Sequence, residues 1–200
     1  MSSDYLIRAT AAKGMVKAVG ALTTKAVARA KEIHKLSPTA SAALGRSLTG
    51  AALLSTSLKG KKHSLTLQIK GDGPLGSIVV VADADSNVRG YVSNPGIHLP
   101  LNEAGKLNVG AGIGKGYLNI IKDLGLKEPY IGRVDLVSGE IGEDIAYYCA
   151  YSEQIPTVVS LGVLVDFNGN IVNSGGYFLQ LMPGADESLI SHIENKMNMI

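Results

Sequence analysis

The chain has 200 residues, 46% of them hydrophobic and 18% charged, and its formal net charge is +2. A chain of this length can build a sizeable core without a disulfide or a metal, and the composition excludes a disordered chain. Its single cysteine excludes an intrachain disulfide and fits a reducing compartment. No apolar run approaches the ~18 residues that span a membrane, and no secretory signal pattern is present, so we expect a cytoplasmic protein.

The charged residues are distributed unevenly. Residues 1–70 hold 12 Lys and Arg against 2 Asp and Glu, whereas residues 71–200 hold 7 against 15. A basic face for nucleic acid is one interpretation. Because the basic half lacks interleaved aromatic residues and contains no DNA-reading motif, we favour mutual neutralisation of the two halves within one fold or dimer. We therefore predict no nucleic-acid partner.

Two strands and two helices are predicted in the first part of the chain. Ser37 is placed to cap the second helix and Pro38 to occupy its first position. That helix carries Ala and Leu on nearly every side, so we expect it to be buried between layers. The predicted ranges are strands 4–10 and 15–21 and helices 24–36 and 38–58.

A β-rich middle follows. Ser64–Lys70 alternates apolar and polar residues, as a half-buried strand does. Ser77–Ala82 is a continuous apolar run, which is expected when both faces of a strand are buried. It forms a hairpin with the strand Val88–Val92. A longer loop is expected over 94–113, and the next two predicted strands are 117–121 and 130–137.

The last part of the chain contains a helix, a hairpin and the start of a fourth helix, predicted at 138–152, 157–165 with 171–181, and from Asp186. The fourth helical pattern stops at Ile200 without a cap, which predicts that the natural protein continues. Helices and strands are mixed without regular βαβ alternation. The predicted fold is therefore α+β, with antiparallel or mixed sheets packed against the buried Ala- and Leu-rich helix.

Two glycine-rich loops, Gly71–Gly76 and Gly110–Gly116, are candidates for a phosphate cradle. A P-loop needs Ser or Thr after its Lys and then a helix, whereas Gly116 follows Lys115 and the next segment resembles a strand. We favour turns that enter strands. A small-ligand or nucleotide-binding module that uses these loops remains the alternative function.

The other reactive side chains predict neither a catalytic nor a metal site. Glu140, Glu143 and Asp144 crowd the start of the third predicted helix, where carboxylates complement the helix dipole. The four His are scattered without metal-ligand spacing. Cys149 lies on an apolar helix face, where a thiol behaves as a small hydrophobe. No arrangement of Ser, His and Asp for nucleophilic catalysis is recognisable, so we predict that the chain is not an enzyme.

Several segments, in the same order along nearly the whole chain, resemble the heat shock protein 33 family of redox-regulated holdase chaperones; they are 71–95, 114–118, 152–157 and 175–185. The resemblance implies a dimerising α+β core domain over 1–183 and the start of a helical linker over 184–200. It also implies ATP-independent binding of unfolding or oxidatively damaged client proteins, which prevents their aggregation under heat and oxidative stress.

In full-length members of that family, a C-terminal module holds Zn²⁺ through four Cys in Cys-x-Cys and Cys-x-x-Cys pairs. Oxidation of these thiolates to disulfides releases zinc and unfolds the linker that covers the client surface. This chain has none of the four, and Cys149 is not one of them. We therefore expect no metal ligand, no cofactor and no such switch in this chain.

The resemblance also predicts the partners: client proteins and a second copy of the chain, with no membrane. Aromatic residues of the C-terminal half are candidates for an apolar surface that holds clients, although such residues are more often core. The candidates are Tyr147, Tyr148, Tyr151, Tyr177 and Phe178.

Overall fold

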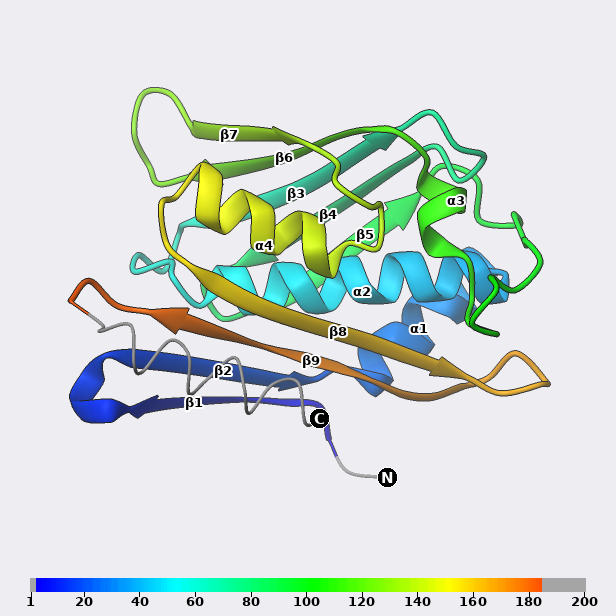
Figure 1. Ribbon diagram of the computed structural model, residues 1–200, viewed down its shortest axis with the longest axis horizontal. Helices are drawn as coiled ribbons and strands as arrows, with labels where there is room; N and C mark the ends of the chain where they lie inside the picture. The colour runs from blue at the N-terminus through cyan, green and yellow to red at the C-terminus, as the bar shows by residue number, and fades with distance from the viewer. Residues whose placement is uncertain (1–2, 185–200) are drawn as a thin grey trace.

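Two β-sheets enclose the longest helix, with a second helix beside it (Figure 1). The structure is a computed structural model that describes residues 3–184. The four-stranded sheet contains, in spatial order, β1 (Tyr5–Ala11), β2 (Val16–Leu22), β9 (Ile171–Leu181) and β8 (Thr157–Val165). The five-stranded sheet contains β5 (Val88–Val92), β4 (Ser77–Asp83), β3 (Ser64–Gly71), β6 (Gly116–Asp123) and β7 (Tyr130–Asp135).

Every strand pair in the two sheets is antiparallel, and the predicted α+β class is confirmed. The α-helices of the described chain are α1 (Thr24–His34), α2 (Pro38–Ser55), α3 (Val109–Ile113) and α4 (Gly142–Tyr151), and a short 3-10 helix, η1 (Ala12–Gly14), joins β1 to β2. In Figure 1, α2 and α4 lie between the two sheets, whereas α3 lies at one end. The main core therefore forms where α2 and α4 meet the inner faces of both sheets.

Helix α2 is buried along nearly its whole length, as predicted. The Ser37 hydroxyl accepts a 3.1 Å hydrogen bond from the Ala40 N–H, and Pro38 occupies the first turn, so both sequence signals are used. Small residues let neighbouring elements approach closely: a Cβ on Gly45 would lie 2.8 Å from the side chains of Val163 and Val27. The helix thus joins the two sheets through one core.

The prediction that the strand Ser77–Ala82 is buried on both faces is wrong. Ile78, Val80 and Ala82 are buried, but Val79 and Val81 are only half-buried on the opposite face of β4. The helices α2 and α4 cover only the inner face of the five-stranded sheet, so its outer face stays open (Figure 1). An apolar run alone does not distinguish a half-covered antiparallel strand from a fully covered one.

The remaining elements differ from the predictions mainly at their ends. The segment predicted as a loop over 94–113 contains the short helix α3, capped by the Asn108 side chain. Strand β7 ends at Asp135 instead of 137, and α4 begins at Gly142 instead of Ser138. Residues 136–141, between β7 and α4, form a turn whose backbone N–H groups donate hydrogen bonds to the Asp144 carboxylate.

The predicted fourth helix from Asp186 lies outside the described residues, as does all but the first residue of the predicted linker. Within 3–184, the structure contains no helix with the length and apolar character needed to cross a membrane.

Candidate functional site

The structure separates the five candidate aromatic residues into two groups. Tyr148 and Phe178 are buried in the core, and Tyr177 on β9 is half-buried. Tyr147 and Tyr151 are 40% and 69% exposed on the outer side of α4. Their rings stack with centroids 5.5 Å apart, one helical turn from each other. Only these two form an aromatic surface of the kind the sequence predicted.

The stacked pair lies beside strand β7. Tyr147 and Tyr151 line a shallow hollow of about 290 Å³ together with Arg133 and Asp135 of that strand. The Arg133 guanidinium lies 3.5 Å from the Tyr117 ring centroid, a cation–π contact that holds it along the sheet. The hollow can therefore accept an apolar or aromatic side chain next to a fixed charge.

Beneath this surface is a buried polar cluster. The Tyr148 phenol donates a 2.7 Å hydrogen bond to Glu153 Oε1, and the Lys122 ammonium of β6 pairs with the same oxygen. Burial raises the pKa of Tyr148, and the hydrogen bond to Glu153 raises it further. The Tyr148 hydroxyl, the Glu153 carboxylate and the Lys122 ammonium thus find hydrogen-bond partners in one another. Such a cluster stabilises the fold.

Cys149 is the next residue along α4 and is fully buried. Burial raises the pKa of its thiol to about 12, and the nearby Glu153 carboxylate adds to the effect. A thiol with such a pKa carries almost no thiolate at neutral pH. The structure therefore agrees with the predicted inert cysteine.

The acidic residues at the start of α4 have different roles. The Asp144 carboxylate is buried and accepts hydrogen bonds from the N–H groups of Val137, Ser138, Gly139 and Ile141, at 2.8 to 3.3 Å. Glu143 is exposed in the first turn, as the helix-dipole interpretation requires. Glu140 lies before the helix begins at Gly142, so the prediction that it complements the helix dipole from the first turn is wrong.

Glu140 instead pairs with Arg46, the one charged residue of α2, and accepts a hydrogen bond from the Gly110 N–H. The pair joins a cation of the basic half to an anion of the acidic half, as mutual neutralisation predicts. Within 3–184, no three His, Cys, Asp or Glu side chains are grouped to hold a metal ion. Because the chain has one Cys, a zinc site made of cysteine thiolates does not fit its residues.

The two glycine-rich loops lie against each other. The N–H groups of Asp72, Gly73 and Leu75 donate to the carbonyls of Lys115, Ile113 and Gly112 at 2.8 to 2.9 Å. The Asp72 carboxylate accepts a 2.7 Å hydrogen bond from the Lys115 N–H. A phosphate cradle needs free backbone N–H groups, and these donors are already used. The glycines serve close backbone approach instead.

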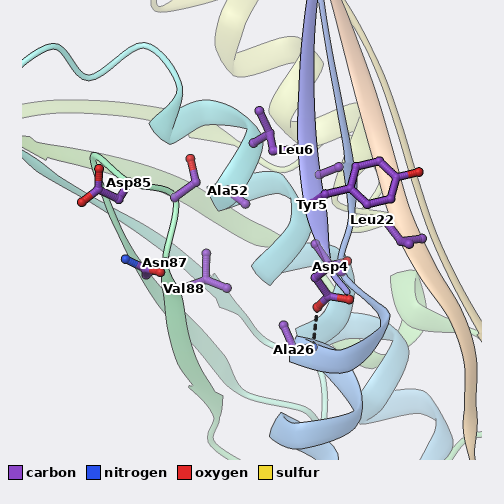
Figure 2. Close-up of a pocket in the computed structure, with 12 residues that line it drawn as sticks. Asp4, Tyr5, Leu6, Leu22, Ala26, Ala52, Asp85, Asn87 and Val88 are labelled. Atoms are coloured by element: carbon purple, nitrogen blue, oxygen red, sulfur yellow. Dashed lines mark hydrogen bonds between the residues drawn. The ribbon is translucent and has the colours of Figure 1, made fainter. Parts of the chain in front are cut away.

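Figure 2 shows a pocket of about 400 Å³ between β1, the start of α1, α2 and the β4–β5 turn, which the sequence did not indicate. The Asp4 carboxylate at its rim accepts hydrogen bonds from the N–H groups of Lys25 and Ala26, at 2.9 and 2.7 Å. Figure 2 draws the bond to Ala26. Asp4 therefore caps α1 from 21 residues away, while Thr23 makes no side-chain cap. The Asp4 carboxylate therefore has a structural role at the start of α1.

A larger groove of about 660 Å³ runs between strand β8 and the segment 98–107. Its walls carry Leu101 and Leu107 on one side and Leu161 and Val163 on the other, and Phe167 stands fully exposed at the β8–β9 turn. Exposed apolar side chains around a groove are typical of a binding surface. Sequence reasoning missed this groove, because Phe167 occurs in an ordinary Asp-Phe-Asn-Gly turn.

The family model described as Hsp33 protein matches residues 4–200. The chain belongs to the Hsp33 family. It is 58% identical over 197 residues to the 33 kDa chaperonin of Acetivibrio thermocellus, covering 98% of this chain and 67% of the relative. The 33 kDa chaperonin of Ruminiclostridium cellulolyticum is 56% identical, with 97% and 66% covered.

The fold agrees with this assignment. The crystal structure of the 33 kDa chaperonin (heat shock protein 33 homolog) from Thermotoga maritima matches with a TM-score of 0.93 at 41% identity, covering 98% of this chain and 67% of that one. This chain thus spans about two thirds of the length of the relatives it matches. The predicted family, its chaperone function and its non-enzymatic class are confirmed.

Proposed function

We propose that this Hsp33-family chain holds unfolding proteins without ATP and keeps them from aggregating under heat and oxidative stress. The observation that carries the proposal is the match to chaperonins along nearly the whole chain, in sequence and in fold. Independence from ATP is supported by the glycine-rich loops, because N–H groups of the first loop already donate to carbonyls of the second, and the Lys115 N–H donates to the Asp72 carboxylate. A nucleotide-binding module is correspondingly disfavoured.

Clients would bind through apolar surface, because unfolding exposes apolar side chains that favour burial. Of the predicted candidates, Tyr147 and Tyr151 are the two whose rings reach solvent as a stacked pair. Tyr148 and Phe178 are buried in the core and stabilise the fold, and the Tyr177 side chain is half-buried. We assign client contact to Tyr147 and Tyr151 on this basis.

The chain is further proposed to act as a cytoplasmic homodimer, as the family resemblance implies. The measurement is sedimentation equilibrium, which would give twice the chain mass of 20.9 kDa for a dimer. A single-chain mass across the concentration range would overturn this part of the proposal and leave the chaperone function untouched.

The function is tested by light scattering of a client protein unfolded by heat or denaturant, in reducing buffer and without ATP. Suppression of aggregation at near-stoichiometric ratios supports a holdase that needs no zinc switch. The matched control is an equal concentration of a folded protein of similar size and charge. Equal scattering with the chain and with the control would contradict the proposal.

A further inference from the structure

Strand β7 leaves one edge of the five-stranded sheet open, because it pairs only with β6. The Leu136 N–H, one residue after β7 ends, donates to the Gly116 carbonyl of β6. In an antiparallel ladder this bond fixes the alternation along the strand, so Ile131, Arg133 and Asp135 turn their N–H and C=O groups away from β6. Within 3–184, no hydrogen bond reaches the backbone groups of these three residues.

The space beside this edge is open. In Figure 1, β7 is the outermost strand of its sheet, and α4 lies on the inner side of that sheet. The hollow of about 290 Å³ borders Arg133 and Asp135, with the rings of Tyr147 and Tyr151 along its other side. Ile131, at the other end of the edge, is 60% exposed. A row of unpaired backbone groups beside open space is the geometry that accepts another strand.

The side chains at this edge carry one charge of each sign. Arg133 and Asp135 are two residues apart, so they point to the same, outer face of the sheet. Within 3–184 neither forms an ion pair, and the Arg133 guanidinium lies over the Tyr117 ring. Charges of one sign on an edge strand keep a second copy from pairing with it. A cation and an anion at alternate positions instead make the edge complementary to itself.

We propose that the β7 strands of two copies of this chain pair antiparallel about a two-fold axis, which joins the two five-stranded sheets into one. In the register that we assign, Arg133 of each copy lies opposite Asp135 of the other. Ile131 of each copy then lies opposite Val137, and these side chains are 60% and 61% exposed. A shift of two residues in either direction would place Arg133 opposite Arg133 or Asp135 opposite Asp135, which is destabilising. Charge complementarity therefore selects one register.

The axis of this pairing is perpendicular to the joined sheet. The stacked rings of Tyr147 and Tyr151 in both copies therefore lie on the same side of it, the side of α4. This inference rests on the proposed homodimer, because it names the surface through which the two copies associate.

The first test reverses one charge at a time. Arg133→Asp and Asp135→Arg each place like charges opposite each other at both ends of the pairing. Each should weaken dimerisation about tenfold or more in sedimentation equilibrium. The matched control is Arg89→Asp, which makes the same change in charge as Arg133→Asp at an exposed position of β5, the opposite edge strand of the sheet. Its dimer should be as stable as that of the unmodified chain.

The second test restores charge complementarity in two ways. In an equimolar mixture of the Arg133→Asp and Asp135→Arg chains, opposite charges face each other at every paired position. The two variants should therefore associate with each other more tightly than either does with itself. A chain that carries both substitutions also places opposite charges together and should recover dimerisation. A variant that merely fails to fold would not be rescued by either route.

The third test leaves the chain unmodified and follows amide hydrogen exchange by NMR. The outward N–H groups of Arg133 and Asp135 should exchange more slowly as the protein concentration rises through the dimerisation range, because the second copy accepts hydrogen bonds from them. Equal exchange of these two amides in monomer and dimer would overturn the pairing.

The outcomes separate this inference from the homodimer on which it rests. If the unmodified chain dimerises and neither charge reversal weakens the dimer, β7 is not the interface and the homodimer stands. If the mixture is no tighter than the single variants, or if Arg89→Asp weakens the dimer equally, the assigned register is wrong. If the unmodified chain has the mass of a single copy at every concentration, the homodimer and the β7 pairing both fail. The aggregation assay then decides the holdase function alone.

Discussion

The Tyr148 hydroxyl and the Glu153 carboxylate, five residues apart, are joined by a 2.7 Å hydrogen bond, and the same carboxylate oxygen pairs with Lys122. Tyr148 belongs to α4, Glu153 follows it, and Lys122 lies in β6. The cluster therefore fixes the end of α4, with the exposed Tyr147 and Tyr151 rings, against the five-stranded sheet.

Glu153→Gln should lower the free energy of unfolding by about 2–4 kcal/mol, because it leaves the largely buried Lys122 ammonium without its counter-charge. Urea unfolding at neutral pH measures the change. The matched control is Glu32→Gln, which breaks the exposed pair with Arg29 and should cost less than about 0.5 kcal/mol. Similar losses in the two variants would show that the buried pair contributes no more than a surface pair.

The pH dependence of stability should change above pH 9 because of Cys149. Its pKa is raised to about 12 by burial, so the folded thiol keeps a proton that the unfolded thiol has released. The contribution to stability is fully present below the unfolded pKa, near 9, and is lost as the pH rises toward 12. Unfolding experiments between about pH 8 and 11 should show a smaller loss for Cys149→Ala than for the unmodified chain. Equal slopes for the two proteins would contradict a buried, protonated thiol.

Gly71→Ala should destabilise the fold, because a Cβ there would overlap the Ile113 carbonyl of the facing loop. We expect a loss of about 2–4 kcal/mol in urea unfolding, as for other severe backbone clashes. Gly96→Ala is the control, since a Cβ at Gly96 would meet no atom within 4 Å. If Gly71→Ala were as stable as the control, the two glycine-rich loops would not pack as described.

The double variant Tyr147→Ser with Tyr151→Ser tests the aromatic client surface. Both rings are exposed, so the free energy of unfolding should change by less than about 1 kcal/mol. Suppression of client aggregation should need several times more of the variant than of the unmodified chain. The control is Tyr91→Ser, which removes another exposed ring, from the far strand β5. Equal activity of the double variant and the unmodified chain would remove these residues from the client surface.

The sequence predicted most elements because their signals are local. Ser37 and Pro38 predicted where α2 begins, and the Asp-Phe-Asn-Gly turn predicted the β8–β9 hairpin. The family resemblance rested on segments spread over nearly the whole chain. The match to the Hsp33 family model over residues 4–200 confirms it.

Side-chain contacts and packing between elements, which the sequence pattern does not encode, account for what the sequence could not predict. The start of α4 is set by the Asp144 carboxylate, which holds the preceding turn and delays the helix to Gly142. The β8 groove exists only because segment 98–107 folds back beside a strand some 60 residues later in the chain. Which face of β4 is open depends on where α2 packs, and a continuous apolar run does not encode that.

The proposed holdase function is tested most directly by asking whether the chain binds unfolded polypeptide without nucleotide. Sedimentation velocity of the chain mixed with reduced, carboxymethylated α-lactalbumin, which stays unfolded and soluble, measures this complex, with the folded form of the same protein as the control. We predict a faster-sedimenting complex with the unfolded form alone, in reducing buffer without ATP. Absence of a complex, or equal binding of the folded form, would contradict it.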